Sequence, residues 1–341
     1  MDIPSVMAMS TDVSCGESRG RPGGRSGGRS GGRLGGRTGV RFGVGGSPVL
    51  SGPRLAALAL ALGEVERGCA VSDRLLLDPV GVVRRYRDPL ELELVGLLAS
   101  SLAFGNVRLI RGAVEEVLVR LGGDLLGVVG DRGCVLGRLG GFRYRMVSGE
   151  DVARLLYGAR CVQREGGSLG AVFASEYGSS GDLRGALSGW VGRIRGRAGF
   201  GGGGDEGRRG PGHVLSDPGG GSGCKRLMLY LRWMVRRDDG VDLGVWGGMS
   251  PSVLLMPVDT HVLRVSRNLG MTGRGVASWG ASEDITGVLR LIDPLDPVRY
   301  DFALCHFGMS GGCPSRPGEV ACEGCVARVV CLWSGGGEVG G

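Results

Sequence analysis

Apolar residues recur along most of this chain with the period of an α-helix. Between residues 90 and 121 they return every three or four positions, which places them on one face of a helix. The Gly105-Asn106 pair interrupts this run, so the pattern predicts two helices with a break between them. Asp88-Pro89 precedes the run and is typical of a helix start.

The same period continues toward the C-terminus. Ser148-Gly149-Glu150-Asp151 is typical of a helix start, and a helix is expected over residues 151–165. No alternating run of β-branched residues is longer than four, so the pattern predicts an all-α fold. The remaining helices are predicted over residues 180–195, 225–237, 259–269, 282–292 and 297–307.

Glycine changes this picture at the N-terminus and in the middle of the chain. Gly accounts for 71 of the 341 residues, and Arg-Gly-Gly repeats fill residues 18–46. A segment with so little apolar surface cannot offset the entropy lost on ordering, so we expect residues 1–50 to be a disordered tail. The helical region is expected over residues 51–335, with residues 199–223 as a Gly-rich loop insertion.

The net charge of +7 is concentrated in this tail. Residues 1–50 carry seven Arg against Asp2, Asp12 and Glu17, a charge of +4, which leaves +3 for the rest of the chain. Such a tail is typical of a sequence-independent contact with a polyanion. Biased composition or a wrongly assigned start would give the same pattern, since Lys225 is the single lysine against forty arginines.

Ten cysteines occur in a chain with no hydrophobic signal segment and no apolar run long enough to span a bilayer. Disulfides are rare in reducing compartments, whereas cysteine metal sites are common there. We therefore expect a cytoplasmic protein without membrane contact, whose C-terminal cysteines bind metal.

The strongest chemical pattern is Cys313-x8-Cys322-x2-Cys325-x5-Cys331. A Cys-x2-Cys pair presents two sulfurs on one turn, and a cysteine on each side completes four thiolates, which suits a [4Fe–4S] cluster or a tetrahedral zinc ion. One such pair instead of two favours the iron–sulfur cluster over zinc. Cys305 is expected in the core, although it could replace Cys313 as a ligand.

Asp259 follows Pro257 and begins an apolar helical pattern. An aspartate there is typical of an N-cap, which accepts hydrogen bonds from the first free amides and interacts favourably with the helix dipole. The same position keeps a carboxylate ionised and directed at whatever lies before the helix. Such a group could stabilise a developing positive sugar or activate water. The local sequence by itself favours the cap.

The run from Val258 to Val265, Val-Asp-Thr-His-Val-Leu-Arg-Val, together with the four cysteines, resembles the helix–hairpin–helix DNA glycosylase superfamily of the endonuclease III type. The resemblance implies a two-lobed helical glycosylase-like fold with a C-terminal four-cysteine metal loop. It also implies that Asp259 is the catalytic carboxylate and that the four cysteines hold a [4Fe–4S] cluster near DNA. The first cysteine gap has eight residues here and six in that superfamily.

Four further stretches are similar to a poorly characterised bacterial branch of the same superfamily. This likeness covers roughly residues 75–335 and supports the fold, but the branch has no settled activity to transfer. The stretches are residues 88–107, 141–145, 224–236 and 242–246.

The chain departs from the endonuclease III pattern before Asp259. That family places a Leu-Pro-Gly-Val-Gly hairpin, and then a lysine nucleophile, about eighteen residues ahead of the aspartate. The matching stretch here, residues 237–242, has a single glycine, aspartates at its tip and no lysine. The aspartates oppose a phosphate contact, and Schiff-base chemistry is not expected at that position. Lys225 could be a displaced nucleophile, although a surface or phosphate-contacting role is favoured.

Other DNA contacts are assigned by position along the chain. Family enzymes fill the hole left by an extruded base with a glutamine, and the matching stretch here offers Leu102 or Phe104 as an apolar wedge, with a core position as the favoured alternative. The face of the 225–237 helix could contact phosphates or simply be solvated. The candidate phosphate contacts are Lys225, Arg232, Arg236 and Arg237.

These observations make a DNA-binding, base-excision-repair-like protein the leading hypothesis. A flipped nucleotide would enter a cleft between two helical lobes, with Asp259 as the catalytic carboxylate of a monofunctional DNA N-glycosylase. The expected partner is damaged or mismatched duplex DNA, and a monomer is expected. The alternative is a non-catalytic nucleic-acid-binding iron–sulfur protein that retains the glycosylase scaffold, which the missing lysine and acidic hairpin favour.

Overall fold

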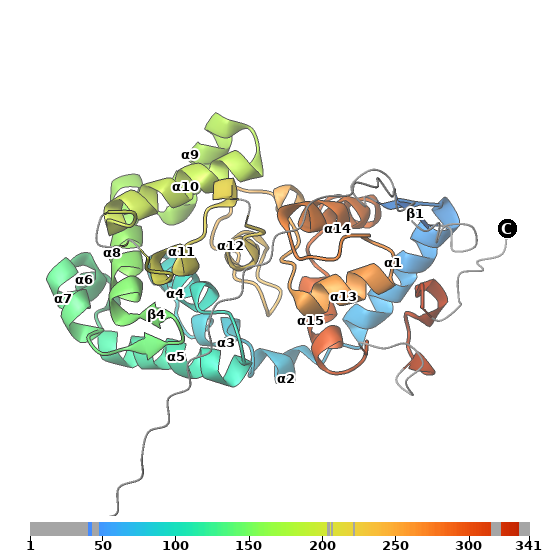
Figure 1. Ribbon diagram of the computed structural model, residues 1–341, viewed down its shortest axis with the longest axis horizontal. Helices are drawn as coiled ribbons and strands as arrows, with labels where there is room; N and C mark the ends of the chain where they lie inside the picture. The colour runs from blue at the N-terminus through green and yellow to red at the C-terminus, as the bar shows by residue number, and fades with distance from the viewer. Residues whose placement is uncertain are drawn as a thin grey trace, which may run out of the picture. The chain divides into compact units, whose positions relative to one another are not determined.

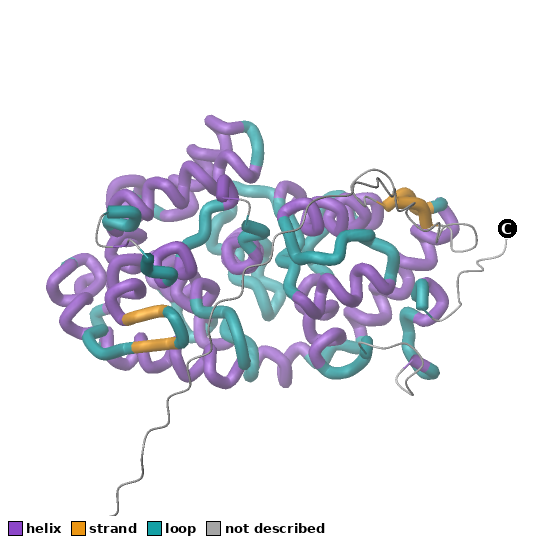
Figure 2. Tube along the Cα trace, in the orientation of Figure 1, coloured by secondary structure: helices purple, strands orange, loops and turns teal. Residues whose placement is uncertain are grey.

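The computed structural model describes residues 40–42 and 48–333, apart from 203, 204, 206, 221 and 315–321. The chain divides into two units, residues 1–34 and 35–341, and the first lies outside the described residues. Helices dominate the second unit, as Figure 1 and Figure 2 show, which confirms the predicted all-α class. None of the helices in its described part is both long and apolar enough to cross a membrane.

The helices follow one another through most of the second unit, and its strands are short. The α-helices are α1 (Gly52–Arg67), α2 (Val71–Leu75), α3 (Val80–Val83), α4 (Pro89–Ser101), α5 (Val107–Leu121), α6 (Leu125–Gly130), α7 (Arg132–Arg138), α8 (Gly149–Gly166), α9 (Leu169–Ser180), α10 (Leu183–Ala198), α11 (Gly210–Val214), α12 (Lys225–Val235), α13 (Thr260–Asn268), α14 (Trp279–Ile292) and α15 (Asp301–Met309). The 3₁₀-helices are η3 (Pro218–Gly220), η4 (Pro251–Val253) and η6 (Arg328–Val330), and the strands are β1 (Val40–Phe42), β2 (Pro48–Leu50), β3 (Arg143–Tyr144) and β4 (Val147–Ser148).

The predicted break at Gly105-Asn106 separates α4 from α5. Gly105 has a φ of +101°, which residues with a side chain rarely adopt. Asn106 then caps α5, because its side chain accepts a hydrogen bond from the Arg108 amide. The two helices predicted on either side of this break are confirmed.

The predicted helix start near residue 150 is also confirmed. Ser148 and Asp151 form a capping box, in which each side chain accepts a hydrogen bond from the backbone amide of the other residue. The pattern does not predict α9, because its few apolar residues are interrupted by glycine, alanine and serine. The local signal for α9 is its N-cap, Ser168, which accepts from the Ala171 amide.

Regular structure begins earlier than predicted. Strands β1 and β2 pair antiparallel, with Arg41 opposite Val49, so part of the predicted disordered tail is strand. Residues 1–39 and 43–47 of that tail lie outside the described residues. The predicted loop insertion at residues 199–223 contains two short helices, α11 and η3.

Two buried apolar clusters hold the helices together. The first draws mainly on the segments from α3 to α12. The second is built from α1, α13, α14 and α15, with Val330 from the C-terminal segment. The chain passes from the first cluster to the second between Leu255 and Met256, and Trp279, Val298 and Phe302 later return to the first. Asp259 follows this passage by three residues and begins α13, so it lies where the two clusters meet along the chain.

Candidate active site

Asp259 is the N-cap residue of α13, as its local sequence predicts. Its Oδ1 accepts hydrogen bonds from the backbone amides of His261 at 2.9 Å and Val262 at 2.8 Å. These bonds satisfy two of the amides that the first turn of a helix leaves free. Because both bonds end on the same oxygen, they fix the orientation of the carboxylate and leave Oδ2 for other partners.

The second oxygen of Asp259 faces a lysine and a thiol. Lys225 Nζ lies 3.3 Å from Oδ2, and Cys305 Sγ lies 3.7 Å from the same oxygen. Lys225 begins α12 and Cys305 lies on α15, so three segments far apart in the sequence meet at one point. The side chains of the ion pair are 32 % and 20 % exposed, which leaves the site partly open to solvent.

Burial and charge act in opposite directions on this site. Burial raises the pKa of Asp259, but the Lys225 ammonium and the Val262 amide lower it more, so this pKa lies below its ordinary value. Burial lowers the pKa of Lys225, but Asp259, Cys305 and Asp301 raise it above its ordinary value. Burial, and then the Asp259 charge, raise the pKa of the Cys305 thiol. At neutral pH the site therefore holds a carboxylate, an ammonium and a protonated thiol.

Lys225 is poorly suited to the first position of a helix, because its charge opposes the helix dipole. The preceding residue, Cys224, is buried and has a φ of +46°, a conformation that costs a side-chain-bearing residue about 1 kcal/mol or more. The ion pair with Asp259 offsets the unfavourable dipole. The structure thus pairs Lys225 with the candidate catalytic residue, where the sequence favoured a surface or phosphate-contacting role.

A chain of buried ion pairs continues from the site along α12. Arg232 pairs with Asp301, and its Nε donates to Asp242 Oδ1 at 3.1 Å. Arg236 pairs with the other carboxylate oxygen of Asp242. Burial raises the pKa of Asp301 to about 6, with Arg232 opposing the rise and Asp259 adding to it. Buried charged side chains therefore extend from the site along α12 into the interior of the protein.

Arg232 and Arg236 are accordingly directed at carboxylates and away from solvent. Arg236 also pairs with Asp239 and Asp296. A phosphate contact by either arginine would first require a buried ion pair to break, which is costly. Arg237 is exposed, so it is the one of the three predicted arginine contacts whose guanidinium meets solvent.

In the turn at residues 237–242, aspartate side chains accept hydrogen bonds from the backbone amides of the turn itself. Asp238 Oδ1 accepts from the Gly240 amide at 3.0 Å, and Asp239 Oδ1 accepts from the amides of Val241 and Asp242, also at 3.0 Å. The two carboxylates occupy the donors that a phosphate would need. The sequence indicates that this turn disfavours a phosphate contact, and the occupied amides explain why.

Leu102 and Phe104 differ in exposure. Leu102 is fully buried and belongs to the core. Phe104 is half-buried, with the Arg226 guanidinium 5.3 Å above its ring and the His213 ring at 4.2 Å. Burial, and then the Arg226 charge, lower the pKa of His213 to about 4, so this imidazole is neutral. Arg226 directly follows Lys225, which places this aromatic cluster next to the ion pair along α12.

The four C-terminal cysteines are half-buried neighbours. Cys313 Sγ accepts a hydrogen bond from Asn268 Nδ2 at 3.3 Å. Burial raises the pKa of Cys313, the Asn268 bond opposes this rise, and the charges of Cys331 and Cys325 add to it. Burial likewise raises the pKa of Cys325, with Cys331 and Cys322 adding to the rise. The four sulfurs thus act on one another electrostatically.

Four cysteine thiols are the type of ligand that a thiophilic metal binds. All four thiols are free of disulfides, and four such thiols are the ligands of a [4Fe–4S] cluster or a structural zinc ion. Among the described residues, no three His, Cys, Asp or Glu side chains converge closely enough to enclose a metal ion. Residues 315–321, between Cys313 and Cys322, lie outside the described residues. Cys305 directs its sulfur at Asp259, which does not support it as a replacement ligand.

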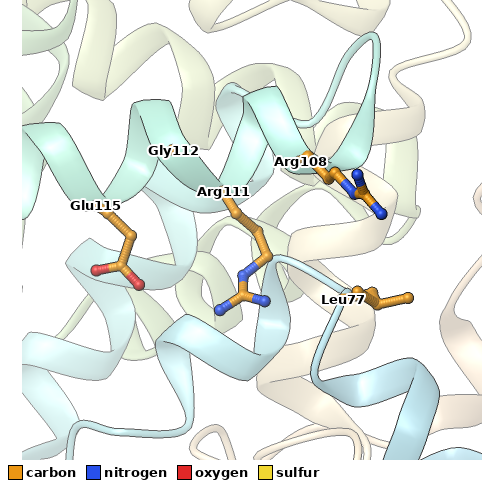
Figure 3. A pocket seen from close by; sticks show the side chains of 5 residues that line it. All are labelled: Leu77, Arg108, Arg111, Gly112 and Glu115. Atoms are coloured by element: carbon orange, nitrogen blue, oxygen red, sulfur yellow. The ribbon is translucent and has the colours of Figure 1, made fainter.

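Two surface pockets lie away from the ion pair. One, of about 280 Å³, lies along α5, where Figure 3 shows Arg108, Arg111 and Glu115 projecting on the side of Leu77. The other, of about 810 Å³, is lined by residues between 66 and 71, between 235 and 251, and between 293 and 303. Both linings are charged, and neither contains Asp259.

Comparison with known proteins places the chain in one family. The sequence profile of that family matches residues 78–310, more than half of the chain. The matched region includes Lys225, Asp259 and Cys305 and ends before the four C-terminal cysteines. No curated protein and no solved structure matches the chain. The chain therefore belongs to the family described as "Protein of unknown function (DUF2400)".

Proposed function

We propose that the chain binds DNA and cleaves an N-glycosidic bond, with Asp259 as its catalytic carboxylate. The observation that carries this proposal is the separation of roles between its two oxygens: Oδ1 caps α13, while Oδ2 lies among the side chains of α12 and α15. A carboxylate held in this way, with a lowered pKa, stays ionised throughout the neutral range. It is ready to oppose a positive charge on a sugar.

In this reaction a flipped nucleotide would bring its sugar C1′ to Oδ2 of Asp259. The bond between C1′ and the base nitrogen breaks, and its electron pair leaves with the base. The carboxylate stabilises the positive charge that develops on the sugar, and it orients the water whose oxygen bonds to C1′. The proton lost by that water balances the one that the departing base takes up.

The proposed substrate is damaged or mismatched duplex DNA, bound by a two-lobed, helix–hairpin–helix glycosylase-like scaffold. Two apolar clusters joined at Leu255 and Met256 support the two lobes. Exposed Arg237 supports a phosphate contact. The four C-terminal cysteines would hold a [4Fe–4S] cluster or zinc, which when bound stabilises the segment folded around it.

Asp259→Asn is expected to lower base excision by about 100-fold or more, because the charge is lost while asparagine still caps the helix. Base release would be measured on duplexes with oxidised, alkylated, deaminated or mismatched bases. Asp182→Asn is the matched control, since Asp182 caps α10 in the same way, through the Gly185 amide. Excision unchanged by Asp259→Asn, or no excision by the unaltered protein on any duplex, contradicts the catalytic role.

Lys225 supports a second candidate reaction, in which its amine attacks the sugar directly. The ammonium would first pass a proton to Asp259, 3.3 Å away. The amine nitrogen would then bond to C1′ as the base leaves with the electron pair, and opening of the sugar ring would give an imine. In the resting site, however, Lys225 is protonated and paired, which favours water as the nucleophile.

Borohydride trapping separates the two reactions, because Lys225 is the single lysine of the chain. Borohydride reduces an imine to a stable amine, which would link protein to DNA that carries an abasic site. We expect excision without a trapped complex. A complex that is lost in both Lys225→Gln and Lys225→Arg would instead establish the amine reaction, since a guanidinium forms no such imine. A complex that survives both changes would point to the N-terminal amine.

The remaining alternative is a non-catalytic nucleic-acid-binding protein that keeps the scaffold, and the lack of a lysine in the turn at residues 237–242 is consistent with such a loss of excision. That alternative predicts salt-sensitive DNA binding that is unchanged by Asp259→Asn and is not followed by base release.

A further inference from the structure

A buried arginine at the start of α1 lies beside the cysteine segment. Arg54 is 1 % exposed, and its Nη2 donates to the backbone oxygens of Val330 at 2.5 Å and Leu269 at 3.3 Å. Its Nε and Nη1 are buried and have no hydrogen-bond partner among the described residues. Of the described side chains, Cys331 is the one whose charge acts on the Arg54 pKa. The guanidinium therefore lacks a carboxylate and has two unused donor nitrogens.

Such an arrangement is unfavourable unless a negative group completes it. A charge taken out of water without a partner costs several kcal/mol, and each buried donor left without an acceptor adds about 1–3 kcal/mol. Burial accordingly lowers the pKa of Arg54, and Cys331 opposes that decrease. The protein has other arginines in its core, but Arg232 and Arg236 are paired with aspartates. Arg54 differs from them, because its two hydrogen bonds go to backbone oxygens and its Nε and Nη1 meet no acceptor among the described residues.

The two carbonyl groups that Arg54 holds flank the cysteine site. Val330 directly precedes Cys331 in the chain. Leu269 directly follows Asn268, whose side-chain amide donates to the sulfur of the first cysteine. Arg54 thus ties the residue after α13 and the residue before Cys331 to α1.

We propose that Arg54 is the counter-cation of a metal centre formed by the four C-terminal cysteines, an inference that rests on the metal centre included in the proposed function. Four thiolates give either Zn²⁺ or an oxidised [4Fe–4S] cluster a net negative charge, so the same guanidinium serves both. Its free Nε and Nη1 supply donors to that charge. Arg54 is a positioning residue, since it acts through the ligands and makes no bond to the metal.

The test compares Arg54→Met and Arg54→Lys in the full-length protein. Each protein would be purified anaerobically and reconstituted with Fe²⁺ and sulfide or, separately, loaded with Zn²⁺. Methionine keeps the length of the side chain without its charge or donors, so metal retention against a chelator is expected to fall about 10- to 100-fold. Lysine keeps the charge and should restore part of the loss. Arg67→Met is the matched control, because Arg67 lies exposed at the other end of α1 and pairs with Glu64.

Urea unfolding of the metal-free and metal-loaded forms separates this role from a purely structural one. Metal-free Arg54→Met should be at least as stable as the metal-free parent, because an uncompensated buried charge is gone, whereas the loaded variant should be less stable than the loaded parent. Equal destabilisation of both forms, or unchanged metal retention, overturns the proposal. A parent protein that binds neither metal overturns it together with the metal centre, and it leaves Asp259-dependent excision as a separate question.

Discussion

Replacing Asp242 by alanine is expected to destabilise the folded protein by about 3–5 kcal/mol, because removing one partner from a buried ion pair leaves an uncompensated charge. Asp242 is completely buried, and its two oxygens bind two different arginines, Arg232 and Arg236. Both arginines are themselves buried, so neither can recover its hydration by a small movement. Urea titration would measure the loss in the free energy of unfolding. The dependence of that free energy on urea concentration would be compared between the two proteins.

The neighbouring aspartate provides the control for this prediction. Asp238 lies in the same turn, pairs with Arg84 and has a side chain that is 60 % exposed. Water replaces the partner of an exposed ion pair, so Asp238→Ala should cost about 1 kcal/mol or less. Similar losses for Asp238→Ala and Asp242→Ala would show that the turn itself, and not the buried arginine pairs, determines the stability.

Glu93→Ala is expected to cost about 4 kcal/mol or more, since four buried donors would lose their acceptor at about 1 kcal/mol or more each. Glu93 is 1 % exposed, and its carboxylate accepts from Gln163 Nε2, from the amides of Leu169 and Gly170, and from Trp246 Nε1. The bond lengths are between 2.6 and 2.9 Å. One side chain of α4 thereby joins α8, the start of α9 and the segment after α12.

A conservative change tests whether these hydrogen bonds explain the cost. Glu93→Gln keeps the shape but turns an amide group toward two of the donors, so it should lie between the unaltered protein and Glu93→Ala. Glu116→Ala is the control, because Glu116 makes an exposed ion pair with Arg120 one turn away. Thermal and urea unfolding would both report the difference. A Glu93→Gln protein as stable as its parent would contradict the account.

The helices that the sequence predicts are those with a long apolar stripe or a clear capping signal. The α4–α5 pair and α8 belong to this group, because Gly105, Asn106 and the Ser148 capping box mark their ends. Helix α9 lacks such a stripe, and tertiary packing supplies its stability. The β1–β2 pair escapes prediction for a different reason: each strand has only three residues, and the strands lie within composition typical of disorder.

The candidate site also has residues that the sequence predicts and residues that it does not. Asp259 could be identified from its own surroundings, since capping is local and the Val-Asp-Thr-His run is short. Its partners could not, because Lys225 and Cys305 lie 34 and 46 residues away in sequence and meet it through packing alone. For Arg232 and Arg236, charge predicts a phosphate contact or a solvated position, and the structure buries both. A signal against this was present, since Arg232 stands inside a run of large apolar residues that ends in several aspartates.

The cooperative folding unit extends beyond the stretch that defines the family. Helix α1 contributes Leu58 and Leu62, both fully buried, to the second apolar cluster, and Val330 closes the same cluster from the other end of the chain. The family match, residues 78–310, includes none of these residues. A fragment cut to that match would expose apolar side chains of α14 and α15 that α1 covers, and it should aggregate. Recombinant fragments of this protein therefore need both flanks to stay soluble.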